Sequence, residues 1–335
     1  MPSPRPLRLL VMMPALNEAA TIGSVLARVP RSLSGVAEVS LLVIDDGSTD
    51  ETVQIARAAG ADVISHGHNL GVGVALQTGL AEALRRGVDL AVNIDSDGQF
   101  APEDIAKLIV PVVEGRADFV SASRFLDPAL VPDMPGVKKL GNWGMARIIS
   151  ALVGRRFADV SCGFRCYGRE AMLRLVLLGK FTYTQESFLV LSQKGLRLVE
   201  MPIPVRGVRE FGQSRVASNL WNYAWRTLAI IFGFIRDYSP GLLFNNLTLL
   251  LAVLSAGFGS FFFWHRWSTG AFSPHIWAGF VSAYLFGLAI LVFGLGQIAL
   301  MVARLRSVQE QQLYLARRYL PRLGEPEPPG NPDAN

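Results

Sequence analysis

The sequence predicts an α/β domain with a parallel sheet, followed by two helices that can cross a membrane. Short apolar runs alternate with helical patterns in the N-terminal part, and two long uncharged apolar runs lie near the C-terminus. Alternating strand and helix patterns indicate a parallel sheet that helices cover on both faces. Each apolar run, at about 1.5 Å of rise per residue, can span a hydrocarbon core of about 30 Å.

Five stretches have the length and apolar character of buried strands. They are Leu7–Met13, Val39–Asp45, Asp62–Ser65, Leu90–Asp95 and Phe119–Ser123. Helical patterns lie between and after them, at Ala19–Val29, Glu51–Ala59, Val72–Arg86, Pro102–Glu114 and Lys138–Leu152. Pro102 suits a first helical turn because the N–H that proline lacks is not needed there.

Two further stretches before the apolar runs have a less regular pattern. Leu126–Val137 is rich in proline and aspartate and is expected to form a mobile loop over the site. A second mixed region extends to Pro204. Cys162 and Cys166 have no partner pair or flanking histidine, so reduced structural thiols are expected rather than a metal site or disulfide.

The apolar runs, Gly241–Trp264 and Ile276–Val302, carry arginines on their outer flanks. These are Arg206, Arg209, Arg215, Arg226 and Arg236 before the first run, and Arg304, Arg306, Arg317, Arg318 and Arg322 after the second. In the connector, only Arg266 is charged. By the positive-inside rule, the large domain and both termini are expected in the cytoplasm. Because the arginines lie beside apolar spans, a nucleic-acid-binding face is disfavoured.

We expect four segments along the chain. Residues 1–215 form the cytosolic α/β domain, and 216–240 form amphipathic helices in the headgroup plane with aromatic side chains at the interface. Residues 241–303 form the membrane hairpin, and 304–335 form a basic segment and a disordered tail. The alternative for Val216–Tyr238 is a helix packed on the soluble domain.

The clearest chemical signal is the sequence from Asn93 to Gln99, in which an apolar strand leads into two carboxylates. Asp95 and Asp97 occupy alternate positions, so their side chains can converge on one cation. Carboxylate and amide oxygens suit Mg²⁺ or Mn²⁺, which keep open positions for phosphate oxygens. The alternative is a solvated acidic turn.

Polar residues also follow the first two predicted strands. Asp45 and Asp46 end the second strand and are suited to accept hydrogen bonds from ribose hydroxyls or a base edge. Asp50 is expected to cap the next helix. The first strand ends at Pro14, which bars continued pairing and can leave a slot for a planar base. In open parallel sheets, ligands bind beyond the carboxyl ends of the strands.

Taken together, these motifs resemble the inverting glycosyltransferases of family 2, which have the GT-A fold. The matching stretches follow the family's order: Pro14–Glu18, Asp45–Ser48, Asn69–Gly71, Asp95–Gln99 and Ser123–Phe125. Asp159–Arg165 and Arg209–Arg215 are similar to the branch that includes dolichyl-phosphate mannosyltransferase and bacterial polyprenyl-phosphate glycosyltransferases. The resemblance covers Leu7 to Arg215.

The resemblance implies roles for individual residues. Pro14, Leu16 and Glu18 would line the base pocket, and Asp45 and Asp46 would hold the nucleoside. Asp95, Asp97 and Gln99 would position Mg²⁺ or Mn²⁺ against the diphosphate. The donor and acceptor phosphates would be bound by Arg124, Lys139, Arg209, Ser214 and Arg215. Lys138 and Lys139 stand where the family often has arginine, and which of them reaches a phosphate is left open.

The implied reaction moves one hexose from a nucleotide diphosphate sugar, of the GDP-mannose or UDP-glucose type, to a polyprenyl phosphate. A lipid phosphate has a second pKa of about 6 and needs no general base. Glu186 is therefore expected to contact sugar or helix rather than to act as the base. Asp159 and Arg165 are expected either to shape the acceptor site or to pair with each other.

Two alternatives to this function are kept open. In the first, a lipid with a hydroxyl group is the acceptor, and Glu186 or Asp159 is then indispensable as a base. In the second, the protein is a non-catalytic membrane scaffold that binds a nucleotide sugar. Paired hairpins could associate in the bilayer, so a homo-oligomer is also possible. The motifs do not determine the base, the sugar or the prenyl length.

Overall fold

The computed structural model describes residues 6–134, 136–177, 183–206, 232–233, 236 and 240–319. The chain divides into two compact units. The first comprises Met1–Ala224 together with Leu313–Asn335, and the second comprises Trp225–Gln312. The predicted phosphate-binding residues Arg209, Ser214 and Arg215, and almost all of the predicted interfacial segment, lie outside the described residues.

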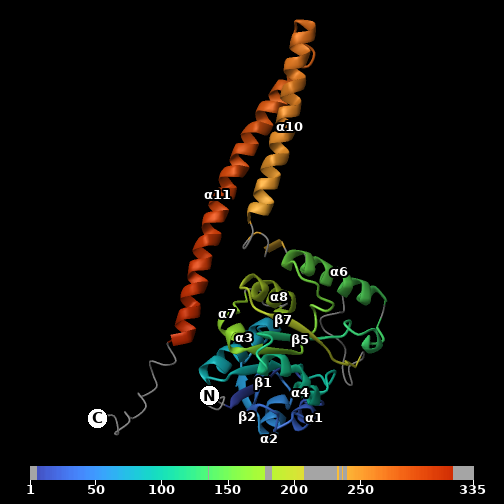
Figure 1. Cartoon of the computed structure of the whole chain (residues 1–335), viewed down its shortest axis with the longest axis vertical. Helices are drawn as coiled ribbons and strands as arrows, with labels where there is room; N and C mark the ends of the chain where they lie inside the picture. Colours follow the sequence, from blue (N-terminus) through green and yellow to red (C-terminus); the bar gives the residue numbers. More distant parts are fainter. Residues whose placement is uncertain are drawn as a thin grey trace, which may run out of the picture. The chain divides into compact units, whose positions relative to one another are not determined.

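The first unit is built on a seven-stranded sheet with the order β3-β2-β1-β4-β6-β5-β7 (Figure 1). The strands are β1 (Leu7–Ala15), β2 (Val36–Asp45), β3 (Asp62–Ser65), β4 (Leu90–Asn93), β5 (Phe119–Ser123), β6 (Arg165–Gly168) and β7 (Leu198–Pro202). All neighbouring pairs are parallel except those of β6, which runs antiparallel to both β4 and β5. The five predicted strands therefore share one direction, and β6, which was not predicted, runs against them.

Helices cover both faces of this sheet. The described helices of this unit are α1 (Ile22–Ala27), α2 (Thr52–Ala58), α3 (Val72–Arg85), η1 (Pro102–Asp104), α4 (Ile105–Leu108), α5 (Val110–Val113), η2 (Pro128–Leu130), α6 (Gly136–Val153), α7 (Arg169–Arg174) and α8 (Tyr183–Gln193), of which α6 packs on α8. The predicted helix Pro102–Glu114 is split into three short pieces. Pro111 follows Ile109 closely and has no N–H to donate, so one continuous helix cannot form there.

One cluster of buried hydrophobic residues lies on one face of the sheet, and α3 packs on the other face over further buried residues. Alternate residues of β1 point to opposite faces: Val11 lies in the core with α1, α2 and α4, whereas Met12 meets α3. Gly79 permits the close approach of α3, because a Cβ there would lie 2.9 Å from Met12 Sδ and 3.1 Å from Ile44 Cδ1. Two packed faces explain why β1 is an almost unbroken apolar run.

The second unit contains α10 (Pro240–Thr269) and most of α11 (Ile276–Tyr319). Both helices are longer than the predicted spans, and the basic residues after Val302 continue α11. Ser255 Oγ donates to Ser282 O at 2.9 Å, and Ser282 Oγ donates to Ser255 O at 2.8 Å. Gly296 allows close contact with Phe244. Small residues and reciprocal hydroxyl bonds are typical of helix pairs in membranes.

Candidate active site

The candidate site lies where β1, β2 and β4, which are neighbours in the sheet, reach their carboxyl ends. Hydrogen bonds join the loops that follow these strands. Ser96 Oγ, after β4, donates to Pro14 O in β1 at 2.9 Å. Thr21 Oγ1, before α1, donates to Ser96 O at 2.8 Å. The structure thus brings the predicted base-binding and metal-binding stretches to one edge of the sheet.

Asn17 joins the loop after β1 to the loop after β2. Its backbone N–H donates to Ser48 Oγ at 2.9 Å, and its Oδ1 accepts a hydrogen bond from Thr49 N at 2.7 Å. Asn17 has φ of 55°, in the left-handed region that asparagine tolerates better than most residues. The motif analysis did not assign Asn17 a role, although an asparagine directly after a strand was an available signal.

Asp45 is buried at the end of β2 and is held as a carboxylate. Its Oδ1 accepts a hydrogen bond from Ser48 N at 2.8 Å, and its Oδ2 accepts one from Ser65 Oγ at 2.6 Å. Burial alone would raise the pKa of Asp45, but the hydrogen bonds from Ser48 and Ser65 outweigh it and lower that pKa. The carboxylate therefore stays ionised over the whole physiological range.

Asp46 holds the loop between β3 and α3. Its Oδ1 accepts a hydrogen bond from Leu70 N, and its Oδ2 accepts one from Gly71 N, both at 2.9 Å. His66 Nδ1 lies 3.0 Å from Asp46 Oδ1. The sequence pattern did not reveal these loop contacts. Binding of a nucleoside by Asp45 and Asp46 remains a prediction.

Gly47 allows the loop after β2 to lie close to the backbone of His68. It has φ of +87°, and a Cβ at this position would lie 2.6 Å from His68 Cα and 2.7 Å from His68 C. No L side chain fits there without moving backbone. Glycine is therefore required by both conformation and space.

Asp95 and Asp97 follow β4, as expected, and differ in their surroundings. Asp97 is only 3% exposed and its Oδ1 accepts a hydrogen bond from Gln99 N at 3.1 Å, whereas Asp95 is partly exposed. Gln99 O accepts a hydrogen bond from Arg206 N at 3.0 Å. The chain that leads towards Arg209 and Arg215 in sequence therefore passes beside the stretch predicted to bind the metal.

Gly163 lies directly against the carboxylate of Asp95. A Cβ there would be 2.8 Å from Asp95 Oδ2 and 3.0 Å from the Tyr183 hydroxyl. Asn93 Nδ2 donates to Gly163 O at 2.8 Å and to the Tyr183 hydroxyl oxygen at 3.2 Å. Burial, and then the negative charge of Asp95, raise the pKa of Tyr183 well above its usual value, so the phenol stays protonated. Asn93 and Gly163 lie in stretches that the sequence singled out but were given no role, and Tyr183 was not predicted; the fold brings the three together from three segments.

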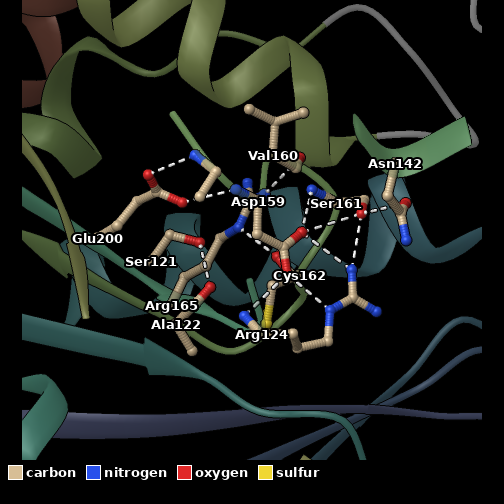
Figure 2. A network of polar contacts seen from close by, with 11 residues as sticks. Ser121, Ala122, Arg124, Asn142, Asp159, Val160, Ser161, Cys162, Arg165 and Glu200 are labelled. Carbon is tan, nitrogen blue, oxygen red and sulfur yellow. Dashed lines mark hydrogen bonds and ion pairs between the residues drawn. The ribbon is translucent and has the colours of Figure 1, made fainter. Parts of the chain in front are cut away.

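Arg124 and Asp159 form a two-pronged ion pair beside the site (Figure 2). Arg124 Nε donates to Asp159 Oδ2 at 2.6 Å, and Nη2 donates to Oδ1 at 2.9 Å. The Asp159 side chain is fully buried. Burial opposes its ionisation, but the bonds and charge of Arg124 outweigh burial and lower the pKa of Asp159. Asp159 is thus a paired carboxylate.

The alternative pairing of Asp159 with Arg165 is wrong. The buried Arg165 donates instead to the backbone, from Nε to Cys162 O at 2.8 Å and from Nη2 to Val160 O at 3.2 Å. Its guanidinium also lies 5.2 Å from the ring centre of Phe188 and 5.5 Å from that of Tyr183. Arg165 therefore fixes the backbone of the segment that carries Asp159 and Gly163.

Glu200 of β7 holds the same segment from the other side (Figure 2). Its two carboxyl oxygens accept hydrogen bonds from Ala158 N and Asp159 N, both at 2.7 Å. Burial raises the pKa of Glu200, although the two backbone donors oppose the rise. The thiol of Cys162 lies in this buried region, and burial, together with the charge of Asp159, raises its pKa to about 12.

The other predicted site residues lie on two helices and in the loop after β1. Glu186 is in α8 and is 8% exposed. Lys139 is in the first turn of α6 and is exposed. Leu16 and Glu18 are partly exposed in the loop that follows β1, next to Pro14 at the strand end. The structure therefore gathers the N-terminal candidates at one edge and places Lys139 on a separate helix.

The residues after β4 fit a divalent cation that completes its coordination with ligand oxygens. Among the described residues, no group of three or more His, Cys, Asp or Glu side chains could hold a metal by itself. Mg²⁺ characteristically takes one or two carboxylates and completes its shell with phosphate oxygens and water. Asp95 and Asp97 supply two hard donors, and the absence of a Cβ at Gly163 leaves space for the Asp95 carboxylate.

Residues 10–175 match the sequence model of glycosyl transferase family 2. The chain is 30% identical over 213 residues to UDP-N-acetylglucosamine–dolichyl-phosphate N-acetylglucosaminyltransferase of Methanococcus voltae, covering 58% of this chain and 83% of that protein. It is 34% identical over 198 residues to dolichyl-phosphate hexose transferase of Haloferax volcanii, covering 59% and 82% of the two chains.

The fold is similar to that of a solved enzyme. Glucosyl-3-phosphoglycerate synthase from Mycobacterium tuberculosis, crystallised with Mn²⁺, uridine diphosphate and glucosyl-3-phosphoglycerate, superposes with a TM-score of 0.53. The match covers 68% of this chain and 80% of that one, at 24% identity. At this identity the likeness establishes the fold and leaves the substrates of this chain open.

Proposed function

Because the chain belongs to glycosyl transferase family 2, in the branch of polyprenyl-phosphate glycosyltransferases, we propose that it transfers one hexose from a nucleotide diphosphate sugar to a polyprenyl phosphate. The domain has the GT-A fold, and the protein is a glycosyltransferase. The observation that carries the finer proposal is the convergence of the β1, β2 and β4 ends. The stretch that holds Asp95 and Asp97 is bonded to the end of β1, and the loop after β1 is bonded to the polar loop after β2.

In this proposal the donor binds across the strand ends. Leu16 and Glu18 line the base pocket with Pro14, and Asp45 and Asp46 face the nucleoside. Asp95 and Asp97, with Gln99, hold Mg²⁺ or Mn²⁺, which would neutralise charge on the diphosphate. The Asp95 carboxylate lies against Gly163, whose missing Cβ leaves room for it beside the Tyr183 hydroxyl.

The reaction is a single displacement at the anomeric carbon. A phosphate oxygen of the lipid forms a bond to that carbon as the bond to the diphosphate breaks, and the nucleoside diphosphate leaves with the electron pair. Two anionic groups must meet, so positive charge at the acceptor is required. We assign that charge to Arg209 and Arg215, with Ser214, Lys139 and Arg124 as further contacts.

The environment of the candidate bases favours a phosphate acceptor over a hydroxyl acceptor. A hydroxyl acceptor needs a general base with a pKa near the working pH. Asp159 is fully buried, is paired with Arg124 and has a lowered pKa, which suits positioning better than proton abstraction. Glu186 is also buried. These facts support the reading in which neither carboxylate is a base.

We propose that the helices α10 and α11 anchor the enzyme. An 18-residue stretch within Leu243–Thr269 has a mean hydropathy of 1.9 and one within Ile276–Tyr319 has 2.4, so each helix is long and apolar enough to cross a membrane. The large domain and both termini would lie on the cytoplasmic side, as the flanking arginines predict. The lipid substrate then never has to leave the bilayer.

A donor-panel assay tests this function. Purified protein in lipid is incubated with GDP-mannose, UDP-glucose or UDP-N-acetylglucosamine, Mn²⁺ and polyprenyl phosphate, and the extracted lipid is analysed by mass spectrometry. We expect one lipid-linked sugar, absent with Asp97→Asn and lost on chelation of the metal. Donor binding with no lipid-linked sugar for any donor would instead support the scaffold alternative.

Replacement of Glu186 separates the two acceptors. With polyprenyl phosphate as acceptor, Glu186→Gln is expected to keep turnover within about tenfold of the parent enzyme, because the nucleophile is already ionised. Near-total loss with intact donor binding would count against the phosphate mechanism. Product formed on diacylglycerol but not on polyprenyl phosphate would establish a hydroxyl-bearing acceptor.

A further inference from the structure

The histidine directly after β3, His66, joins three elements at the candidate site, and the proposed reaction gives it no role. β3 lies beside β2 in a register that pairs Ser65 with Asp45. The next two residues also meet, since His66 Nδ1 lies 3.0 Å from Asp46 Oδ1. On the other side of the ring, His66 Nε2 lies 3.0 Å from Thr78 Oγ1, in the second turn of α3. His66 thus connects the ends of β2 and β3 to the body of α3.

The contact between His66 and Asp46 is enclosed by protein. Their side chains are only 8% and 7% exposed. The Asp46 carboxylate also accepts hydrogen bonds from Leu70 N and Gly71 N, directly before α3. A carboxylate in such a place is stable only when donors surround it. His66 therefore influences both where Asp46 points and how the loop that Asp46 binds is held.

The partners on the two sides of the ring determine where a neutral imidazole carries its proton. An ionised carboxylate only accepts hydrogen bonds, so Nδ1, which faces Asp46, is the protonated nitrogen. Nε2 then accepts, and the Thr78 hydroxyl is the donor that faces it. Within the part of the chain that the structure describes, the Thr78 side chain makes no other hydrogen bond. The bonds therefore run in one direction, from Thr78 through His66 to Asp46.

We infer that His66 is a positioning residue for donor binding, held in the Nδ1–H tautomer, which aligns Asp46 and the loop before α3 by way of Thr78. This rests on the proposed function, in which Asp46 faces the nucleoside. In this role His66 contacts no reacting group and acts through Asp46. A hydroxyl on one side and a carboxylate on the other prevent the ring from turning, so the Asp46 carboxylate is set in place before a donor arrives.

Nitrogen NMR reads the tautomer without any nucleotide. The chain has four histidines, so isotope-labelled histidine in the full chain in detergent gives few ring signals, and those missing from His66→Asn belong to His66. At about pH 8, where a free imidazole is neutral, we expect a protonated Nδ1 and an unprotonated Nε2. A proton on Nε2 alone, or on both nitrogens, would overturn the inference.

Nucleotide affinity tests the positioning role. His66→Phe removes both bonds of the ring, Thr78→Val removes only the hydroxyl with little change of shape, and Thr78→Ser keeps the hydroxyl as the matched control. Calorimetry with GDP, with UDP and with Mn²⁺ needs no turnover. For the nucleotide that the parent binds, we expect Kd to rise about tenfold in His66→Phe and about threefold in Thr78→Val, and to stay within about twofold in Thr78→Ser.

Turnover should show the same division. The donor KM is expected to rise in His66→Phe and Thr78→Val while kcat changes little, because the bonds of His66 are the same before and during sugar transfer. A loss confined to kcat would contradict a role in donor binding.

Two further results would overturn the inference. One is an unchanged Kd in both His66→Phe and Thr78→Val, and the other is a rise in Thr78→Ser as large as that in Thr78→Val. The Thr78 pair keeps the test decisive if His66→Phe fails to fold. A parent that binds neither nucleotide would contradict the proposed function as well, whereas unchanged affinity in the variants contradicts the role of His66 alone.

Discussion

At the scale of the residue, the buried carboxylate of Asp159 fixes several groups beside the candidate site. It accepts hydrogen bonds from the Arg124 side chain, from Arg124 N at 3.1 Å and from Ser161 N at 3.1 Å. A buried charge is costly unless such partners surround it. The pair therefore fixes where Arg124 lies and how the segment after α6 runs.

We predict that Asp159→Asn destabilises the domain by about 3 kcal/mol at neutral pH, because it leaves the guanidinium of Arg124 without its counter-charge. The folded-state pKa of Asp159 is lowered, so its stabilisation is complete above the unfolded pKa of about 4 and is lost as the pH falls through the folded value. Thermal unfolding in detergent between pH 7 and pH 3 measures this effect. The gap between parent and variant should narrow below about pH 4; a constant gap would contradict the assignment.

Gly163→Ala tests whether the space left by the missing Cβ of Gly163 is needed to position the Asp95 carboxylate. The added methyl group meets both Asp95 Oδ2 and the Tyr183 hydroxyl, so the carboxylate must shift. A displacement of that kind is expected to lower kcat/KM by about tenfold to a hundredfold and to raise the Mn²⁺ concentration needed for half-maximal rate.

Gly257→Ala is the control for this substitution, because nothing lies within 4 Å of the position that its Cβ would take. It should leave both the rate and the Mn²⁺ requirement unchanged. An unchanged Mn²⁺ requirement in Gly163→Ala, with an intact melting temperature, would show that Gly163 does not act through Asp95.

At the scale of the element, the site is assembled by loops that hold one another. Asp46, from the loop after β2, anchors the start of α3, and Asn17 anchors the loop after β2 to the one after β1. Asp50 Oδ1 accepts a hydrogen bond from Thr52 N at 3.0 Å, so Asp50 supports the first residue of α2, although the N-cap position is Glu51 and not Asp50 as predicted. Each of these loops is therefore positioned by hydrogen bonds to a neighbouring loop as well as by the strand that it follows.

Gly47→Ala is predicted to disturb two loops together. It combines a positive φ with a clash against the backbone of His68, whereas Gly60 has φ of +77° and nothing within 4 Å of its added Cβ. Gly60→Ala should therefore cost only the conformational strain, about 1 kcal/mol, and Gly47→Ala distinctly more. Melting temperatures and the KM for the donor provide the comparison. Equal melting temperatures for the two variants would contradict the role given to the His68 contact.

At the scale of the whole molecule, the charge around the apolar helices carries the prediction of topology. Reporter proteins fused to either terminus are expected to be active in the cytoplasm, and one inserted at Gly270, between α10 and α11, on the opposite side. Fluorescent-protein and alkaline-phosphatase fusions distinguish the two sides. A phosphatase that is active when fused to the C-terminus would overturn the two-span arrangement.

Much of the sheet was predictable because its strands are local patterns. Asp62–Ser65 and Phe119–Ser123 have the predicted bounds, and β1, β2 and β4 differ from prediction only at their ends. The strands β6 and β7 were not predicted. Arg165 and Cys166 open β6 in an irregular run, and its antiparallel place between β4 and β5 follows from long-range pairing. The helix α6 begins at Gly136, two residues before the predicted start and inside the expected loop.

The sequence by itself determined the α/β class, the two apolar helices and the motif residues at the strand ends, because strand and helix periods and motif spacing are written along the chain. The tertiary structure decided that Arg124, not Arg165, pairs with Asp159, and that Gly163, Asn93 and Tyr183 meet at Asp95. Such contacts join residues far apart in sequence, and which of several arginines neutralises a buried carboxylate depends on how the whole domain packs.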